Sequence, residues 1–319
     1  MEKPFRPAMP DTGAQTASSG PFSLDDEPAY RRWRAWKLDG YPTRPEDLMV
    51  RIRDPRAVTE AEIEAMLRVC RKTNMVIYAS DVGTDADKNI AHALGERFGL
   101  RHLDANPLAD DDGVTSLQVV PGKSGRGYIP YSNHRLLWHT DGYYNTMQQP
   151  IRAFLIHCVS PAAEGGENAV LDHEIAYILM RDAAPHYVRA LMAPDAMTIP
   201  PNTEGGSESR GARGGPVFAV DELGGSLLMR YTARTRSIVW KQDPTTLAAA
   251  EFLARLLENE SPYIFHHRLA AGEGLLCNNV LHNRTGFTDD AGRSKTRLLY
   301  RARYYDRIAR TDLSTIYHC

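Results

Sequence analysis

A histidine and an aspartate stand two residues apart in the stretch LLWHTDGYYN, residues 136–145. The aromatic and apolar residues around them are typical of a buried strand. Side chains two apart on a strand point to the same face of a sheet, so His139 and Asp141 could hold one metal ion. Many such pairs are only a surface couple or a hydrogen-bonded pair. A third ligand is needed before the pattern predicts a metal site.

The best candidate for that third ligand is His282, which follows the apolar run GLLCNNVL and precedes a turn. Two histidines and one carboxylate on one face form the facial triad of iron(II) oxygenases, which leaves coordination positions open for substrates. The less suitable histidines fall on a predicted helix, in loops or termini, or in an adjacent pair that points to opposite faces: His92, His102, His186, His318, His266 and His267.

Three arginines form a second feature in the stretch TRLLYRARYYD, residues 296–306. Alternation along a strand places Arg297, Arg301 and Arg303 on one face. The planar guanidinium group can bind a carboxylate through two parallel hydrogen bonds. A charged face on a strand is equally often just solvated. Only the combination with the two histidines and the aspartate predicts a binding site for an anion.

These side chains need a scaffold, and short strands separated by Gly/Pro loops predict one from about residue 114 onward. The many short strands on both sides of helices indicate an α+β protein with a mostly β core, a sandwich or jelly roll rather than a doubly wound sheet. The predicted strands are 75–80, 116–120, 152–159, 216–220, 226–231, 274–281 and 296–305. A first helix is predicted to begin at a capping box formed by Thr59 and Glu62. Three further helices are predicted over 85–98, 174–181 and 244–258.

Domain organisation follows from local composition. Residues 1–24 are rich in Pro, Gly, Ser and Thr, so we expect a disordered N-terminal arm, followed by a single domain over 25–319. The segment from Asn202 to Gly215 holds five glycines, which predicts an inserted mobile loop. Such a loop is either a lid over the site or a simple linker.

The composition of the whole chain excludes several function classes. It has 319 residues, 42% hydrophobic and 24% charged, with a formal net charge of −2 and mixed charges, so we expect no nucleic-acid or membrane partner. The four cysteines show no C-x-x-C spacing, which argues against a disulfide framework and a thiolate zinc site. No secretion signal or membrane span is predicted. We expect a cytoplasmic protein that acts on a small molecule, with a homo-oligomer left open.

Four motifs together resemble a known family: WHTDGYY, GGEN at residues 165–168, LHNRTGF and TRLLYRARY. In this combination the chain is similar to the iron(II)/2-oxoglutarate-dependent oxygenases of the taurine dioxygenase superfamily, and the flanks also resemble the glutarate 2-hydroxylase branch. The resemblance implies a distorted double-stranded β-helix with flanking and inserted helices. It also implies Fe(II) and O2, with 2-oxoglutarate converted to succinate and CO2 while a C–H bond of a small anionic or zwitterionic metabolite is hydroxylated or otherwise oxidised.

The resemblance further assigns roles to individual residues. His139, Asp141 and His282 match the metal ligands, and Arg297 matches the arginine that binds the far carboxylate of 2-oxoglutarate, with Arg293 as a minor rival. Asn168 stands where many members have a threonine, and its amide can donate the same hydrogen bond. Arg301 matches a family position whose side chain contacts the substrate's anionic group or the cosubstrate. Further candidates for substrate contacts, chosen by their neighbourhood in the sequence, are Asn133, Tyr143, Tyr144, Arg230, Arg234 and Arg236.

Two other function classes are compatible with the same residues. A zinc-dependent hydrolase could use the two histidines and the aspartate to activate water, and it would not need Arg297. A jelly-roll binding protein could retain the fold without turnover.

Overall fold

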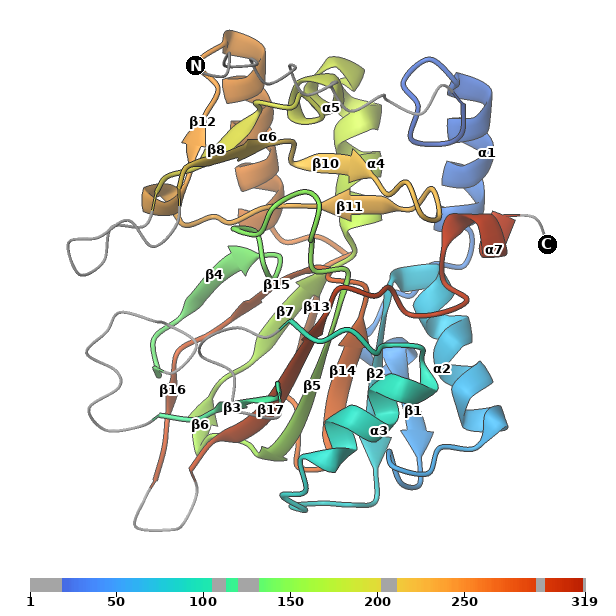
Figure 1. Ribbon diagram of the computed structural model, residues 1–319, viewed down its shortest axis with the longest axis vertical. Helices are drawn as coiled ribbons and strands as arrows, with labels where there is room; N and C mark the ends of the chain where they lie inside the picture. The colour runs from blue at the N-terminus through green and yellow to red at the C-terminus, as the bar shows by residue number, and fades with distance from the viewer. Residues whose placement is uncertain (1–18, 105–112, 120–131, 202–210, 291–295, 318–319) are drawn as a thin grey trace, which may run out of the picture.

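Two β-sheets that face each other form the centre of the molecule (Figure 1), and the predicted α+β class is confirmed. The computed structural model describes residues 19–104, 113–119, 132–201, 211–290 and 296–317. The larger sheet contains, in spatial order, β1 (Met49–Ile52), β2 (Met75–Ser80), β14 (Glu273–Cys277), β5 (Ala153–Ser160), β17 (Leu298–Tyr304) and β3 (Thr115–Leu117). The smaller contains β13 (Phe265–His267), β7 (Asn168–Leu171), β15 (Leu281–Arg284) and β4 (Leu136–His139).

The chain changes sheet between β14 and β15. All pairings in the two large sheets are antiparallel except that of β1 with β2. β14 ends at Cys277 in the larger sheet, and β15 begins at Leu281 in the smaller one. The prediction of one strand over 274–281 is therefore wrong, because two consecutive asparagines form a turn there, with Asn279 at a φ of 49°.

Three small sheets complete the strand content of the described residues. They pair β10 (Phe218–Val220) with β11 (Leu227–Met229), β8 (Met197–Ile199) with both β12 (Val239–Trp240) and β9 (Arg213–Gly215), and β16 (Phe287–Thr288) with β6 (Glu164–Gly165). The glycine-rich segment is thus not a loop throughout, because its last three residues form β9. Residues 202–210 of that segment lie outside the described residues.

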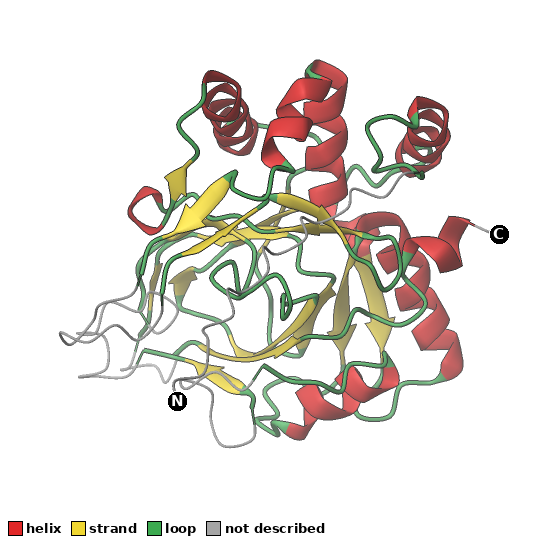
Figure 2. Cartoon of the chain, turned by 45° about the horizontal axis from the view of Figure 1, so that its top comes forward, coloured by secondary structure: helices red, strands yellow, loops and turns green. Residues whose placement is uncertain are grey.

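The helices cover the strands from outside (Figure 2). They are α1 (Glu27–Leu38), α2 (Glu60–Thr73), α3 (Asn89–Arg97), α4 (His173–Ala183), α5 (Pro185–Leu191), α6 (Pro244–Glu258) and α7 (Leu313–Tyr317), with short 3-10 turns at Pro45–Leu48 and Thr235–Ser237. The capping box that predicted α2 is present, since Thr59 and Glu62 bond each other's backbone N–H. α3 begins four residues later than expected from 85–98, because Asp85 and Asp87 bind Arg56 instead of entering the helix. Within the described part of the chain, no helix is long and apolar enough to cross a bilayer.

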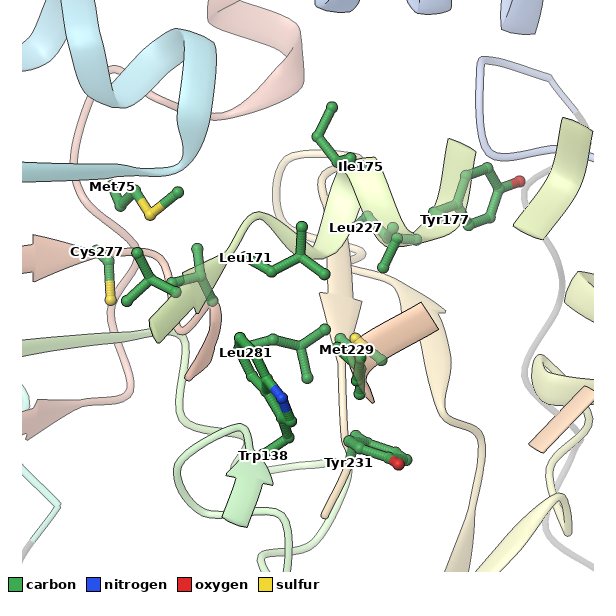
Figure 3. Packing of buried hydrophobic residues seen from close by; sticks show 14 of the residues in the cluster. Met75, Trp138, Leu171, Ile175, Tyr177, Leu227, Met229, Tyr231, Cys277 and Leu281 are labelled. Carbon is green, nitrogen blue, oxygen red and sulfur yellow. The ribbon is translucent and has the colours of Figure 1, made fainter. Parts of the chain in front are cut away.

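The main hydrophobic core lies between the two large sheets and extends toward α4 and the β10–β11 hairpin. Figure 3 shows part of it, with side chains from both sheets and from the hairpin meeting in one interior: Met75, Cys277, Leu171, Leu281, Leu227 and Met229. A second core packs α2 and α3 against the outer face of the larger sheet. Antiparallel pairing and apolar burial on both faces fix the larger sheet in position.

Residues 21–23, which fall within the predicted N-terminal arm, pack against the folded domain. Residues 1–18 lie outside the described residues, but Phe22 is only 2% exposed, and its ring centroid lies 4.8 Å from that of Trp33 and 5.4 Å from that of Tyr177. The guanidinium of Arg181 also donates to the backbone carbonyls of Pro21 and Ser23. These contacts attach residues 21–23 to α1 and α4.

A fully buried lysine joins the same two helices. Lys37 in α1 has no exposed surface, and its Nζ lies 2.7 Å from Asp172 and 2.5 Å from Glu174, at the start of α4. Burial disfavours the charged amine, but the two carboxylates outweigh that effect and raise the pKa of Lys37. The cluster is therefore charged and internally compensated.

We predict that Lys37→Met lowers the free energy of unfolding by about 3–5 kcal/mol, because it leaves two buried carboxylates without their cation. Urea unfolding measures this. Lys241→Met is a matched control, since Lys241 forms an exposed ion pair of 2.9 Å with Asp195 that contributes about 0–1 kcal/mol. Equal losses in both variants would contradict the prediction.

Candidate metal centre

The histidine and the aspartate of the opening motif are held by different parts of the fold. His139 is the last residue of β4, whereas Asp141 follows the strand in a turn. The expectation that both lie on one regular strand is therefore wrong for Asp141. Pairing of β15 with β4 places His282 directly opposite His139. Two strands and one turn thus deliver the three side chains to one place.

The three side chains form a compact, buried cluster. One ligand atom from each of His139, Asp141 and His282 can be chosen so that all lie within 4.8 Å of one another. The two imidazole centroids are 4.1 Å apart, and Nε2 of His139 is 3.7 Å from Oδ1 of Asp141. Each residue is 5–6% exposed. Among the described residues, this is the one group of three or more His, Cys, Asp or Glu side chains with such spacing.

Backbone carbonyls orient both imidazoles. Nδ1 of His139 lies 2.9 Å from the carbonyl oxygen of Leu137, and Nδ1 of His282 lies 2.9 Å from that of Val280. A carbonyl oxygen only accepts hydrogen bonds, so each Nδ1 carries the proton and each Nε2 keeps its lone pair. This is the arrangement found in metal-ligating histidines.

The charge states of the cluster also suit a cation. Burial, followed by the neighbouring imidazole of His139, lowers the pKa of His282 to about 3, so its ring is neutral. Burial alone would raise the pKa of Asp141, but the charges of Arg301 and Arg303 and the interactions with the two imidazoles together outweigh it and hold this pKa well below the usual range. Oδ2 of Asp141 is buried and has no hydrogen-bond partner among the described residues. Two nitrogen lone pairs and one carboxylate with an unused oxygen fit a divalent metal such as iron(II).

Arg297 supplies a buried positive charge next to β17. The residue is 5% exposed and immediately precedes the strand, while the pairing of β17 with β5 is irregular between Leu298 and Leu299. Its guanidinium carbon lies 5.0 Å from the ring centroid of Phe287, and no described residue accepts a hydrogen bond from its guanidinium. Burial lowers the pKa of Arg297 to about 10, so it remains protonated at neutral pH. A buried guanidinium that forms no ion pair with a described residue could be compensated by an anionic ligand.

Arg284 adds a second positive charge near the same ring. Its guanidinium carbon is 4.8 Å from the centroid of Phe287, and its Nη2 donates to the carbonyl oxygens of Ser132 and His134. Burial and the charge of Arg297 lower the pKa of Arg284 to about 9. The sequence analysis missed Arg284, although it lies within the quoted motif LHNRTGF. Arg293 lies outside the described residues.

Asn168 lines a small interior cavity between the two sheets. Its amide nitrogen donates to the carbonyl of Asn283 at 3.1 Å, and no described residue uses the second amide hydrogen. The walls of the cavity come from both sheets: Ile77, Ile156, Val170, His267, Leu269 and Leu275. His267, which the sequence analysis set aside, is thus a cavity residue, whereas His266 is exposed.

A larger pocket, with a cavity volume of about 80 Å³, opens to solvent at His139 and Asp141. Four of the predicted substrate contacts, Tyr143, Tyr144, Arg234 and Arg301, line it together with Arg303. Nη1 of Arg301 also lies 3.3 Å from Oδ1 of Asp141, which connects the pocket to the metal cluster.

The remaining predicted contacts lie elsewhere in the described structure. Asn133 has an exposed side chain and does not line the pocket, while its carbonyl accepts from the backbone of Phe287. Arg230 is buried and donates to backbone carbonyls, including that of Met197, so its role is structural. Arg236 is exposed. Neighbourhood in the sequence is a weak guide here, because successive side chains of an extended chain point in different directions.

Comparison with known proteins gives a consistent result. The family model "Taurine catabolism dioxygenase TauD, TfdA family" matches residues 43–303. A uridine-5'-phosphate dioxygenase from Streptomyces sp. is 30% identical over 220 residues, which cover 66% of this chain and 76% of that relative.

Solved structures with the same fold include two non-haem iron oxygenases. An asparagine oxygenase in complex with Fe(II), 2S,3S-3-hydroxyasparagine and succinate has a TM-score of 0.54 and 18% identity over 76% of this chain and 78% of that one. The oxygenase OrfP in complex with Fe and alpha-ketoglutaric acid has a TM-score of 0.54 and 16% identity over 78% of this chain and 81% of that one. The chain therefore belongs to the TauD/TfdA family and is a 2-oxoglutarate-dependent non-haem iron dioxygenase.

Proposed function

We propose that His139, Asp141 and His282 bind one Fe(II), and that the enzyme hydroxylates, or otherwise oxidises, a C–H bond of a small anionic metabolite. The observation that carries the proposal is the buried cluster of two imidazoles and one carboxylate beside an arginine-lined pocket. Bound iron(II) supplies the chemistry that couples oxidation of the substrate by O2 to conversion of 2-oxoglutarate into succinate and CO2. We assign the two facing sheets to a distorted double-stranded β-helix.

Arg297 is assigned to the far carboxylate of 2-oxoglutarate. Its guanidinium is buried and finds no acceptor among the described residues, so a carboxylate would both neutralise it and accept two parallel hydrogen bonds. Arg284 adds positive potential, and the second amide hydrogen of Asn168 is assigned to the same carboxylate. A zinc hydrolase does not need this buried cation, and a binding protein without turnover does not need the buried cluster of two imidazoles and one carboxylate. The oxygenase is the function that uses both features.

The primary substrate is assigned to the pocket with Arg234, Arg301 and Arg303. Arg303 is already engaged by Asp104 and by the hydroxyl of Tyr144, and Arg301 contacts Asp141, so both are oriented by protein groups. The side chain of Arg234 has no partner among the described residues. We therefore assign the substrate's anionic group to Arg234, with Arg301 as a second contact. The rings of Tyr143 and Tyr144 and the side chains of Leu136 and Leu137 limit the access of water.

The relatives suggest which anions to test. One acts, by its name, on uridine 5'-phosphate, and the structure of another holds hydroxyasparagine. The resemblance to the glutarate 2-hydroxylase branch adds dicarboxylates. The test is succinate formation from 2-oxoglutarate with Fe(II) in air, in the presence of glutarate, uridine 5'-phosphate, asparagine or taurine. Stimulation by glutarate or uridine 5'-phosphate, with matching loss of that compound, supports the proposal. Stimulation only by asparagine or taurine, which are zwitterions without net charge, would refute the anionic class.

The ligand set predicts that His282→Ala lowers Fe(II)-dependent turnover by more than about 100-fold, because even losing an outer partner of a metal ligand costs 10–100-fold. Circular dichroism and the Fe(II) content per chain, measured together, separate loss of metal from loss of fold. His266→Ala is the control, since His266 is exposed and bonds only Glu167. Full activity of His282→Ala would disprove the ligand set.

For 2-oxoglutarate, Arg297→Ala is predicted to raise the Michaelis constant by roughly 30- to 1000-fold, which corresponds to about 2–4 kcal/mol for a lost bidentate contact in a partly dry site. Arg297→Lys should recover only part of this, because an ammonium cannot form the two parallel bonds. Steady-state kinetics with 2-oxoglutarate as the varied substrate decides it. An unchanged constant in Arg297→Ala would remove this residue from the cosubstrate site.

For the primary substrate, Arg234→Ala is predicted to raise its Michaelis constant roughly 10- to 100-fold, the effect of losing one charge-assisted hydrogen bond. The constant for 2-oxoglutarate should change less than about threefold. Arg236→Ala removes the same charge two residues away on the exposed surface, so it controls for long-range electrostatics. Equal effects of the two variants would argue against a direct contact. Arg301→Ala is a poorer test, since it also removes a contact of Asp141.

A further inference from the structure

The turn that carries the chain from one sheet to the other contains a buried asparagine with a left-handed backbone. Asn279 has a φ of 49° and is 6% exposed. It lies after β14 and three residues before His282 in β15. Asparagine tolerates this conformation better than most residues with a side chain. The positive φ explains why asparagine is tolerated at this position, but it does not explain the direction of the side-chain amide.

The amide of Asn279 binds both main-chain polar groups of Asp141. Its Oδ1 accepts from the N–H of Asp141 at 2.8 Å, and its Nδ2 donates to the carbonyl of Asp141 at 2.9 Å. The same Nδ2 donates to the carbonyl of Ile151 at 2.7 Å. Both amide hydrogens and the carbonyl oxygen are thereby used. Rotating the amide by half a turn would break all three bonds, so its orientation is unique.

These bonds replace the strand pairing that Asp141 lacks. β4 ends at His139, and Thr140 still bonds the backbone of Tyr231, but Asp141 lies in the turn beyond. The chain there is tight, since Gly142 has a φ of 66° and an added Cβ would lie 2.3 Å from Ile151. The amide of Asn279 therefore holds Asp141 in the turn through both the N–H and the carbonyl of its main chain.

We propose that Asn279 is a positioning residue that holds the carboxylate of Asp141 in register with His282 for metal binding. The inference rests on the proposed ligand set. The side chain of Asn279 bonds the main chain of Asp141, and Asn279 itself is three residues before His282 in the chain. Asn279 therefore sets the distance between the turn that carries Asp141 and the strand β15 that carries His282. Asn279 does not itself contact the metal cluster through a ligand atom.

Asn279→Gly tests the proposal, because glycine adopts a positive φ without strain and the substitution removes only the amide. Asn74→Gly is a matched control: Asn74 has a φ of 57°, is 2% exposed, and its amide makes three hydrogen bonds, to Asp172, Asn278 and Arg307. Asp141→Asn is the reference for a lost ligand. The readouts are calorimetric titration of the metal-free proteins with Co(II) and their thermal unfolding without metal.

We expect both glycine variants to unfold at lower temperature than the parent. The dissociation constant for Co(II) should rise about 10- to 100-fold in Asn279→Gly, the usual effect of removing an outer partner of a ligand. It should change less than about twofold in Asn74→Gly. This pattern separates positioning of the carboxylate from a general loss of stability.

The opposite outcomes are equally distinct. Parental affinity in Asn279→Gly together with weak binding in Asp141→Asn would overturn the role of Asn279 and leave the ligand set in place. Parental affinity in Asp141→Asn would overturn the ligand set itself, and the inference with it. If Asn279→Gly fails to fold, Asn279→Asp replaces it, since it keeps the acceptor for the N–H of Asp141 but loses both donors. Unchanged Co(II) affinity in Asn279→Asp would likewise refute the proposal.

Discussion

In the pairing of β15 with β4, His282 lies directly opposite His139, and the metal centre depends on that register. A slip of one residue would turn every side chain of β15 to the other face of the sheet. It would put His282 on the face where Leu281 is now buried, so burial of the apolar residue and assembly of the imidazole pair are enforced together. The backbone carbonyls that orient the two rings belong to residues two positions before each histidine, which makes the tautomer a consequence of the same local conformation.

Buried charge is used in two contrasting ways. Around Lys37, two carboxylates surround one ammonium group within hydrogen-bonding distance, so the network is closed and serves to join α1 to α4. Around Phe287, two guanidinium groups lie close to one another, and Arg297 has no acceptor among the described residues. The first arrangement stabilises the fold without a ligand, whereas the second leaves charge for a ligand to neutralise. Whether a buried charge is paired within the protein therefore distinguishes structural from functional ionic groups better than burial does.

The substrate pocket combines groups with different degrees of freedom. Arg301 and Arg303 belong to a central strand and are held by Asp141, Asp104 and Tyr144, so their positions are determined before any substrate enters. Arg234 lies just before a short 3-10 turn and is not engaged by a described residue. Pre-organised groups give orientation at low entropic cost, while a less constrained arginine can adapt to the size of the anion. Specificity within this family is therefore expected to vary most at positions such as that of Arg234.

Local patterns in the sequence were sufficient for several elements and for the metal-ligand residue types. The capping box of α2, the helix Pro244–Glu258 and the strand Met75–Ser80 depend on neighbouring residues only, and each was predicted correctly. The motif with His139 and Asp141, together with His282 and the arginine strand, indicated a metal site and an anion site, since the chemistry of a site is a matter of residue types, and the family resemblance supplied the cosubstrate. The boundary between β14 and β15, the turn position of Asp141, the clamp by Asn279 and the contribution of Arg284 were decided by the tertiary structure. Each of these depends on contacts between residues far apart in the chain, and a one-dimensional pattern carries no information on which distant groups will satisfy a buried hydrogen bond or leave a buried charge unpaired.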